Sequence, residues 1–179
     1  RLMTSNLLIA LALIVPLFGA AVMGLVRHLP NIRESVTLIT AVGLFVLVIC
    51  IVPSVLAGER PSLTIFELLP GLTIAFEAEP LGMLFAMVAS FLWIPTSIYS
   101  IGYMRTHHAE NHTRYFICFA LALGSVIGLA FSANLVTMFL FYETLTLSTY
   151  PLVTHSGTTE AKRAGRIYLG LLLGTSIGL

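Results

Sequence analysis

The sequence has 179 residues, of which 58% are hydrophobic and only 9% are charged. A soluble domain usually has about 25% charged residues, so this composition excludes a soluble globular protein and indicates an integral membrane protein. The formal net charge of +1 gives no case for binding nucleic acid. The sequence also contains no Gly-rich phosphate loop or other nucleotide-binding motif.

Three long stretches of the chain contain no charged residue, and they lie between Arg1 and Arg27, between Glu34 and Glu59, and between Glu79 and Arg105. Each is long enough for a helix to cross about 30 Å of hydrocarbon, which takes about 20 residues. We therefore predict membrane-spanning helices at about Ser5–Val26, Ser35–Ala57 and Pro80–Met104. A signal peptide is the alternative for the first, but its apolar run exceeds the usual length of about 7–15 residues, and its basic residues follow the run.

The stretch 115–159 contains a single charge, Glu143. It is too long for one crossing and suits two, and the polar run 132–134 predicts a tight turn between them. We expect a fourth helix at about 113–131 and a fifth at about 134–154. Glu143 then lies about nine residues into the fifth helix, or about 14 Å along an axis that rises about 1.5 Å per residue. This depth predicts a carboxylate near the middle of the membrane.

A sixth helix is expected to begin near Ala164, but only about 16 residues remain before Leu179, where about 20 are needed to span the membrane. The chain also lacks an initiator Met, and it stops within an apolar run. We therefore expect a fragment of a longer protein, with the last helix truncated. The predicted fold class is an all-α, polytopic transmembrane bundle of about six helices.

The segment between the second and third helices lacks a helical pattern. Its β-prone runs 62–66 and 72–76 flank Pro70-Gly71, which is a turn dipeptide. The segment therefore predicts a small extracytoplasmic β-hairpin at about 62–77, at the membrane surface.

The basic residues predict the orientation of the bundle. Seven of the nine Lys and Arg residues follow the first, third and fifth predicted helices, namely Arg27, Arg33, Arg105, Arg114, Lys162, Arg163 and Arg166. By the positive-inside rule these loops face the cytoplasm, which puts the N-terminus and the hairpin outside. The predicted localisation is the inner (cytoplasmic) membrane, with multiple crossings.

Glu143 is the strongest candidate for chemistry. A carboxylate at the bilayer centre is costly unless it is protonated, paired or hydrated, and such residues usually mark ion or proton pathways. We predict that Glu143 carries a proton, and that Thr146 and Tyr150, roughly on the same helix face, support it. The alternatives are a protonated Glu143 that only donates a hydrogen bond between helices, and packing roles for Thr146 and Tyr150.

A cationic partner for Glu143 is not evident in the sequence. The only lysine, Lys162, falls in a predicted loop, and all eight arginines lie outside the apolar spans. A buried cation paired with Glu143 would therefore lie beyond Leu179 or on another subunit.

The remaining reactive side chains predict no further site. His107, His108 and His112 could bind a metal if their loop were helical, but a solvated loop explains them better. Cys50 and Cys118 lie in apolar runs without metal-ligand spacing. We predict no metal and no cofactor, and the absence of aspartate excludes the usual Ser/His/Asp triad.

A series of motifs runs from the third predicted helix to the end of the chain. They are EPLGMLF at 79–85, YSIGYM at 99–104, RYF at 114–116, NLVTMF at 134–139, FYETLTLSTY at 141–150 and the segment from Ala164 to Ser176. Together they resemble the antiporter-like membrane subunits shared by respiratory complex I, membrane-bound hydrogenases and Mrp-type cation/proton antiporters. The closest resemblance is to the D-type component of Mrp antiporters or the M-type component of complex I.

The resemblance implies about fourteen helices with two inverted five-helix repeats, which is a known transporter design. Residues 1–79 would supply two peripheral helices and the hairpin loop, and residues 80–179 would supply the third helix and the start of the first repeat. Glu143 would stand where the family's helix-five glutamate pairs with a lysine on helix seven in a proton half-channel. That lysine position and the family's broken helices are not part of this sequence.

The resemblance also implies a function and partners. The chain would belong to a proton-translocating membrane subunit of a multisubunit cation/proton antiporter or of a redox-driven pump of the NADH:quinone oxidoreductase type. Its partners would be other membrane subunits, with protons and, in an antiporter, Na⁺ or K⁺ as the ions. A non-transporting scaffold subunit of the same kind of complex is the alternative. A redox enzyme in its own right is disfavoured, because the chain has no Cys cluster, nucleotide loop or paired intramembrane histidines for haem.

Overall fold

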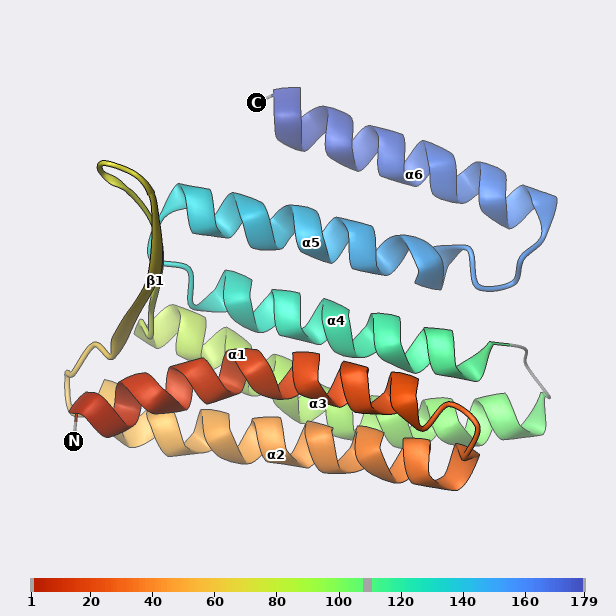
Figure 1. Ribbon diagram of the computed structural model, residues 1–179, viewed down its shortest axis with the longest axis horizontal. Coiled ribbons are helices and arrows are strands. Elements are labelled where there is room, and N and C mark those ends of the chain that lie inside the picture. Colours follow the sequence, from red (N-terminus) through yellow and green to blue (C-terminus); the bar gives the residue numbers. More distant parts are fainter. Residues whose placement is uncertain (1, 108–110, 179) are drawn as a thin grey trace.

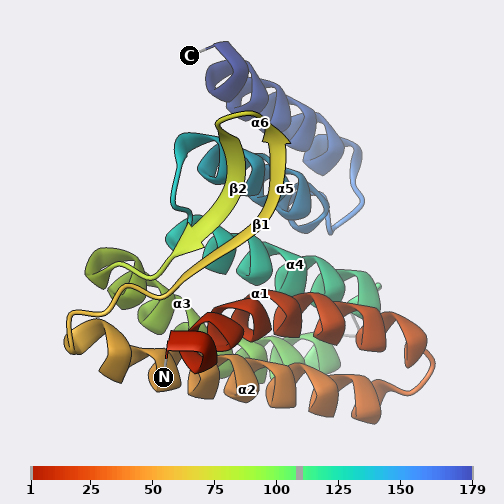
Figure 2. The same cartoon turned by 60° about the vertical axis from the view of Figure 1, so that its left-hand side comes forward.

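The computed structural model describes residues 2–107 and 111–178. Over these residues the chain forms six helices and one two-stranded antiparallel hairpin (Figure 1). In chain order the elements are α1 (Leu2–Leu25), α2 (Pro30–Leu56), β1 (Ser62–Leu69), β2 (Leu72–Glu77), α3 (Pro80–Thr106), α4 (His112–Ala130), α5 (Leu135–Val153) and α6 (Thr159–Gly178). The helices run side by side, and the hairpin stands across one end of the bundle (Figures 1 and 2).

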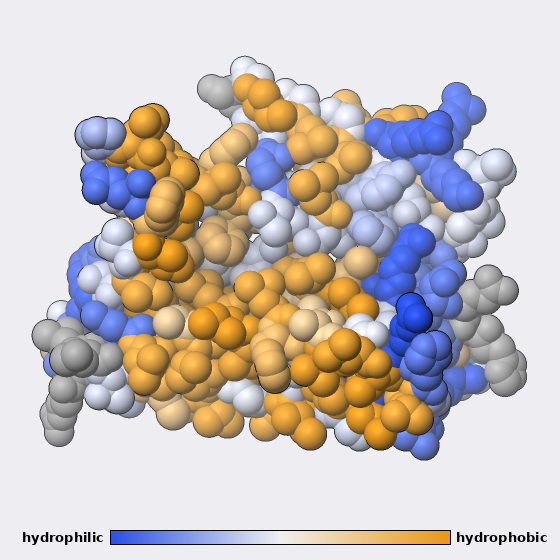
Figure 3. Space-filling view, in the orientation of Figure 1, coloured by the Kyte–Doolittle hydropathy of each residue, from blue (hydrophilic) through white to orange (hydrophobic). Residues whose placement is uncertain are grey.

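Within the described residues, four helices are long and apolar enough to cross a membrane, namely α1 from Asn6 onward, α2, α3 and α4. Large apolar side chains on them point outward, and Leu25, Leu56 and Leu81 are 82%, 81% and 78% exposed. Figure 3 shows apolar residues over the middle of the bundle and hydrophilic residues gathered toward its ends. This distribution suits helices whose outer faces contact lipid.

The last two helices, α5 and α6, are less apolar than the four helices named above. Over its 19 residues α5 carries Glu143 and several hydroxyl side chains, and α6 begins with Glu160, Lys162, Arg163 and Arg166. Neither is among the helices that are apolar enough to cross a membrane by composition. A bundle of six transmembrane helices therefore stays a prediction, because it requires that α5 and α6 also cross the membrane.

Helices α1, α3, α4 and α5 begin and end within a few residues of the predicted positions, whereas α2 begins at Pro30 instead of Ser35 and α6 begins at Thr159 instead of near Ala164. The Thr158 hydroxyl accepts from the Ala161 backbone N–H at 3.1 Å, and the Thr158 carbonyl accepts from the Lys162 N–H at 3.0 Å. These bonds cap the helix before its charged residues. The prediction that Lys162 lies in a loop is therefore wrong, because this residue is in the first turn of α6.

The apolar core lies among the first four helices. Ile9, Met23, Leu44, Trp93 and Phe116 are all at most 2% exposed. In this group α1 packs against α2 and α4, and α3 packs against α2 and α4. Helix α5 packs on the far side of α4, and α6 packs on α5 (Figure 2).

Two glycines allow close approach between helices. A Cβ at Gly82 near the start of α3 would overlap the Ala130 carbonyl oxygen at the end of α4. A Cβ at Gly128 of α4 would overlap the ring of Phe141 on α5. These positions hold α4 close to both neighbours, since any side chain there would force the helices apart.

The structure has a two-stranded antiparallel hairpin where the sequence predicts one, and its extracytoplasmic location stays a prediction. Its strands pair from Ser62 with Glu77 to Leu69 with Leu72, and Gly71 in the turn has φ +88°, which favours glycine. The hairpin is also fastened to the turn between α4 and α5. The Ala75 N–H donates to the Thr137 hydroxyl at 3.1 Å, and the Asn134 side-chain amide donates to the Thr73 carbonyl at 2.6 Å.

Asn134 joins the start of α5 to the hairpin, so Asn134→Ala should lower thermal stability. Its side-chain oxygen accepts from the Thr137 N–H at 2.8 Å as the N-cap of α5. Loss of a cap costs about 1 kcal/mol, and loss of the bond to Thr73 should cost about 1 kcal/mol more. The measurement is the unfolding temperature in detergent. Asn134→Asp, which keeps the capping oxygen, should lose less, and an Ala variant as stable as the parent would contradict the assignment.

Candidate functional site

Glu143 lies at the middle of α5, as the ninth of its 19 residues. Its side chain is half-buried and accepts a hydrogen bond from the Ser176 hydroxyl of α6. The Ser176 hydroxyl also lies 3.3 Å from the Leu173 carbonyl of its own helix. A carboxylate and a rotatable hydroxyl thus meet between two helices, an arrangement that can stabilise a charge or relay a proton.

Ser176 was not among the predicted site residues. It is the second of two hydroxyl residues near the end of α6, Thr175 and Ser176, and a serine in an apolar run has no spacing that marks it as a partner. Only the packing of α6 on α5 brings it to Glu143, which is 33 residues earlier in the chain.

The structure does not join Thr146 or Tyr150 to Glu143. Thr146 is 4% exposed, and its hydroxyl donates to the Tyr142 carbonyl at 3.1 Å. Tyr150 is half-buried, and its ring lies beside Gly165 of α6, where an added Cβ would come within 3.1 Å of it. These contacts suit packing of α5, and the supporting roles predicted for both residues stay a prediction.

The other hydroxyl side chains of α5 are largely bonded within the helix. Each donates to a carbonyl three or four residues earlier, at distances of 2.7 to 3.1 Å, and the residues are Thr144, Thr146, Ser148 and Thr149. Such bonds satisfy a polar helix without water. Glu143 is therefore the charged group of α5, and the bond to Ser176 comes from a different helix.

A second polar cluster joins α2, α3 and α4 at the end of the bundle opposite the hairpin. Glu34 of α2 is 5% exposed and accepts from the Arg105 guanidinium of α3, through Nε at 3.1 Å and through Nη2. Arg33 is 4% exposed, donates to the Thr113 hydroxyl at 2.9 Å and lies 5.7 Å from the Phe116 ring centroid. The prediction that all arginines lie outside the apolar spans is wrong for Arg33, Arg105 and Arg114, which lie in α2, α3 and α4, three of the helices apolar enough to cross a membrane.

This cluster does not supply the missing cation for Glu143. Its contacts run from Arg33 and Glu34 to α3 and α4, and none reaches α5. Within the described residues Glu143 has no ion-pair partner; the ion pairs found there join Glu34 to Arg105, and Glu77 and Glu79 to Arg60.

His155 follows α5 at the same end as the Arg33 cluster. Its ring lies 5.5 Å from the Tyr115 ring, and its Nδ1 is buried without a hydrogen-bond partner among the residues that the structure describes. Burial lowers the pKa of His155 below the ordinary 6.5, and the positive charge of Arg114 and the nearby His112 lower the pKa further. Folding therefore favours the neutral form of this imidazole.

This shift predicts acid destabilisation. As the pH falls below about 6.5, the unfolded chain binds a proton at His155 that the folded chain does not, so stability should fall until the folded-state pKa is passed. His155→Gln should flatten this dependence. The test is the unfolding temperature in detergent from about pH 5 to 8, with the exposed His28→Gln as control. An unchanged slope in the His155 variant would refute the assignment.

The predicted histidine cluster is only partly described. His107 stacks on Tyr103 at 4.3 Å between ring centroids, and His112 begins α4, whereas His108 lies outside the described residues. Among the residues with described positions, no group of three or more His, Cys, Asp or Glu side chains could hold a metal ion. Cys50 and Cys118 are free thiols on α2 and α4.

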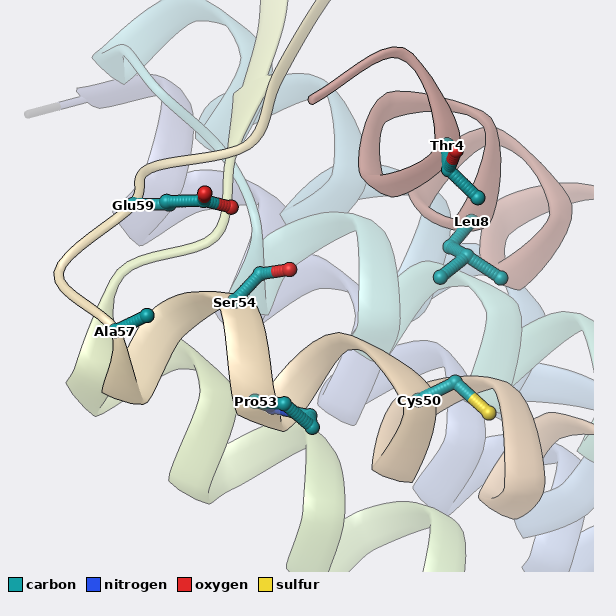
Figure 4. Close-up of a pocket in the computed structure, with 7 residues that line it drawn as sticks. All are labelled: Thr4, Leu8, Cys50, Pro53, Ser54, Ala57 and Glu59. Atoms are coloured by element: carbon teal, nitrogen blue, oxygen red, sulfur yellow. The ribbon is translucent and has the colours of Figure 1, made fainter. Parts of the chain in front are cut away.

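A pocket of about 400 Å³ lies between α1 and the end of α2 (Figure 4). Its lining residues come from three segments: Thr4, Leu8, Cys50, Pro53, Ser54, Ala57 and Glu59. Glu59 is the single charged residue of this described lining. The described lining therefore holds no second carboxylate and no histidine to form an acid–base pair with Glu59.

Comparison with known proteins shows similarity to subunits of membrane complexes. No family model matches it. It is 24% identical over 168 residues to antiporter subunit mnhA2 of Staphylococcus epidermidis, covering 93% of this chain and 20% of that protein. It is 27% identical over 152 residues to the chloroplastic NAD(P)H-quinone oxidoreductase subunit 5 of Mesostigma viride, covering 78% of this chain and 23% of the relative. The same subunit of Anthoceros angustus is 30% identical over 82 residues, 46% of this chain and 11% of the relative.

The fold also matches a solved structure. A chain of the membrane-bound sulfane sulfur reductase, an archaeal respiratory membrane complex, superposes with a TM-score of 0.76 at 17% identity, covering 93% of this chain and 25% of that chain. The present chain thus spans less than a quarter of the length of the three relatives above. These relatives are of the subunit 5 and mnhA2 types, and the finer resemblance to a D-type Mrp component or an M-type complex I component stays a prediction. On its apolar helices and these likenesses, the chain is a multi-pass membrane protein that is similar to antiporter-like membrane subunits of complex I-type oxidoreductases and Mrp-type antiporters.

Proposed function

We propose that this chain is part of a proton-translocating subunit of a multisubunit membrane complex, and that Glu143 carries the proton. The observation that carries the proposal is the Glu143 carboxylate at the middle of α5, bonded to the Ser176 hydroxyl of α6. A carboxylate can accept and release a proton, and a serine hydroxyl can act as both donor and acceptor. The pair therefore has the chemistry for one step of a proton path.

The surroundings of Glu143 support this role. The hydroxyls that follow it on α5, those of Thr144, Thr146 and Ser148, donate to carbonyls of their own helix, so they do not donate to the carboxylate. In a membrane such a group must be protonated, hydrated or paired from elsewhere. A carboxylate that can change between its protonated and ionised forms is suited to proton exchange, whereas a carboxylate held ionised by a permanent ion pair is not.

The relatives support an ion-translocating complex, and their names suggest two kinds of such a complex. Those named as antiporter subunits suggest cation exchange, and those named as NAD(P)H-quinone oxidoreductase subunits suggest coupling to a redox reaction. In either form other membrane subunits would be partners, with protons and, for exchange, Na⁺ or K⁺ as ions. Residues 1–79 would form the peripheral part, and residues 80–179 the start of an antiporter-like repeat.

We further propose that α5 and α6 cross the membrane beside α4, in an inner (cytoplasmic) membrane with the N-terminus outside. Helix α5 has the same 19-residue length as α4 and packs along it. The end bearing Arg27, Arg114 and Arg163 would face the cytoplasm under the positive-inside rule. The hairpin end would then be extracytoplasmic.

A scaffold role is the second candidate function. The Glu143–Ser176 bond itself ties α6 to α5, and α6 has only Gly165 among its buried residues, so this bond could serve attachment alone. Proton uptake by membrane vesicles from cells whose own gene encodes Glu143→Gln separates the two roles. A transport role predicts an assembled complex with lost uptake, whereas a scaffold role predicts lost assembly, or full uptake wherever assembly persists.

A further inference from the structure

A basic pocket lies where the end of α1 meets the start of α4. It has a volume of about 530 Å³ and is lined by Gly24, Arg27, Asn111, His112, Thr113, Arg114, Ile117 and Cys118. The described lining thus contains two guanidinium groups, one imidazole and no carboxylate. It is distinct from the Glu143–Ser176 pair, which lies at the middle of α5.

The two arginines remain available to a ligand. Within the described part of the chain, neither Arg27 nor Arg114 has a carboxylate within ion-pair distance, because the acidic partners found there belong to Arg60 and Arg105. Arg27 donates through Nε to His28 at 3.1 Å, and Arg114 makes one long bond of 3.4 Å to the Pro151 carbonyl. Both side chains therefore keep free N–H groups for an anion.

The start of α4 adds further donors to the same pocket. Asn111 precedes the helix without making a side-chain capping bond, so the first backbone N–H groups have no side-chain acceptor. The positive end of the helix dipole favours an anion here. Together with two arginines that line the same pocket from separate segments, these donors match the oxygens of a phosphate group.

The position of the pocket indicates which kind of molecule carries this phosphate group. Both α1 and α4 are apolar enough to cross a membrane, and the pocket lies at the C-terminal end of α1 and the N-terminal end of α4. This is the level of the lipid headgroups. Ile117 and Cys118, one turn farther along α4, give the pocket an apolar side toward the membrane interior, where an acyl chain would begin.

We propose that this pocket binds the headgroup phosphate of an anionic phospholipid. Arg27 and Arg114 donate hydrogen bonds to the phosphate oxygens from two segments, and the backbone N–H groups at the start of α4 donate to them as well. A zwitterionic lipid carries the same phosphate with a cationic group beside it, which the two guanidiniums repel. The site should therefore discriminate between phosphatidylglycerol and phosphatidylcholine.

The test is native mass spectrometry of the purified protein titrated with phosphatidylglycerol or phosphatidylcholine. The parent should bind phosphatidylglycerol more tightly, and the variant Arg27→Gln/Arg114→Gln should lose affinity by about fivefold per arginine. Arg163→Gln/Arg166→Gln is the matched control, because it removes two exposed arginines outside the pocket lining. Arg27→Lys/Arg114→Lys should keep most of the preference, which separates a charge effect from a folding defect.

Three outcomes would overturn the proposal. Equal binding of the two lipids by the parent would exclude a specific headgroup site. Equal loss in the control variant would mean that general surface charge attracts the lipid. If inorganic phosphate bound to the parent and displaced phosphatidylglycerol, the pocket would be a site for the free anion, and the lipid would be excluded as its ligand.

Discussion

Glu143→Gln should reduce proton uptake by membrane vesicles at least about tenfold, because glutamine can neither bind nor release a proton while it keeps the shape of the side chain. The amide can still accept from the Ser176 hydroxyl, so the α5–α6 contact should survive. The expected result is therefore a complex present at the parental level with lost transport. The measurement is the initial rate of uptake, normalised to the amount of assembled complex.

Two further variants sharpen this test. Ser176→Ala removes the hydroxyl donor and leaves the carboxylate, so uptake should fall by a smaller factor than in Glu143→Gln. Glu160→Gln removes an exposed carboxylate from the first turn of α6, and its uptake should match the parent. Parental uptake in an assembled Glu143→Gln complex would exclude the carboxylate from the proton path.

Gly82→Ala should be strongly destabilising, because its Cβ would overlap a backbone carbonyl that cannot rotate away. That oxygen belongs to Ala130 at the end of α4, next to the turn that fastens the hairpin. Overpacking usually costs about 1–3 kcal/mol, and a clash with backbone should fall at the upper end. The measurement is thermal unfolding in detergent, followed by the fluorescence of Trp93, which is 1% exposed on the same helix.

Gly102→Ala provides the control within α3. A Cβ at Gly102 meets nothing within 4 Å, and alanine favours a helix over glycine by up to about 1 kcal/mol. This variant should therefore unfold at the same temperature as the parent or a higher one. Equal unfolding temperatures for Gly82→Ala and the parent would show that α3 and α4 can separate without cost.

The helices and the hairpin could be predicted because their signals are local. A charge-free stretch such as 35–58 has the length of a membrane helix, and Pro70-Gly71 marks a turn between β-prone runs. The start of α6 was missed because its first turns are charged and lie outside the apolar run on which the prediction depended. The Thr158 cap places the boundary five residues earlier than Ala164.

The side-chain partners could not be predicted, because they depend on distant segments. In the sequence, Arg33 and Glu34 are typical of a charged loop, yet both side chains are buried. Their partners, Thr113 and Arg105, are 80 and 71 residues away in the chain. Glu143 is a candidate because it is the single charge in an apolar stretch of the sequence, and its role stays a prediction. Its bond to Ser176 required the position of a second helix, which no spacing within α5 contains.

Two sets of contacts hold the helices together at opposite ends of the bundle. The polar cluster of Arg33, Glu34, Arg105 and Thr113 joins α2, α3 and α4 at one end. The hairpin is bonded to the start of α5 at the other end. The first four helices, with the apolar core between them, thus form a block braced at both ends. By contrast, α6 packs on α5, and Gly165 is the one buried residue in the described part of α6. A sliding motion of α6 along α5 would therefore separate the Ser176 hydroxyl from the Glu143 carboxylate without uncovering the apolar core.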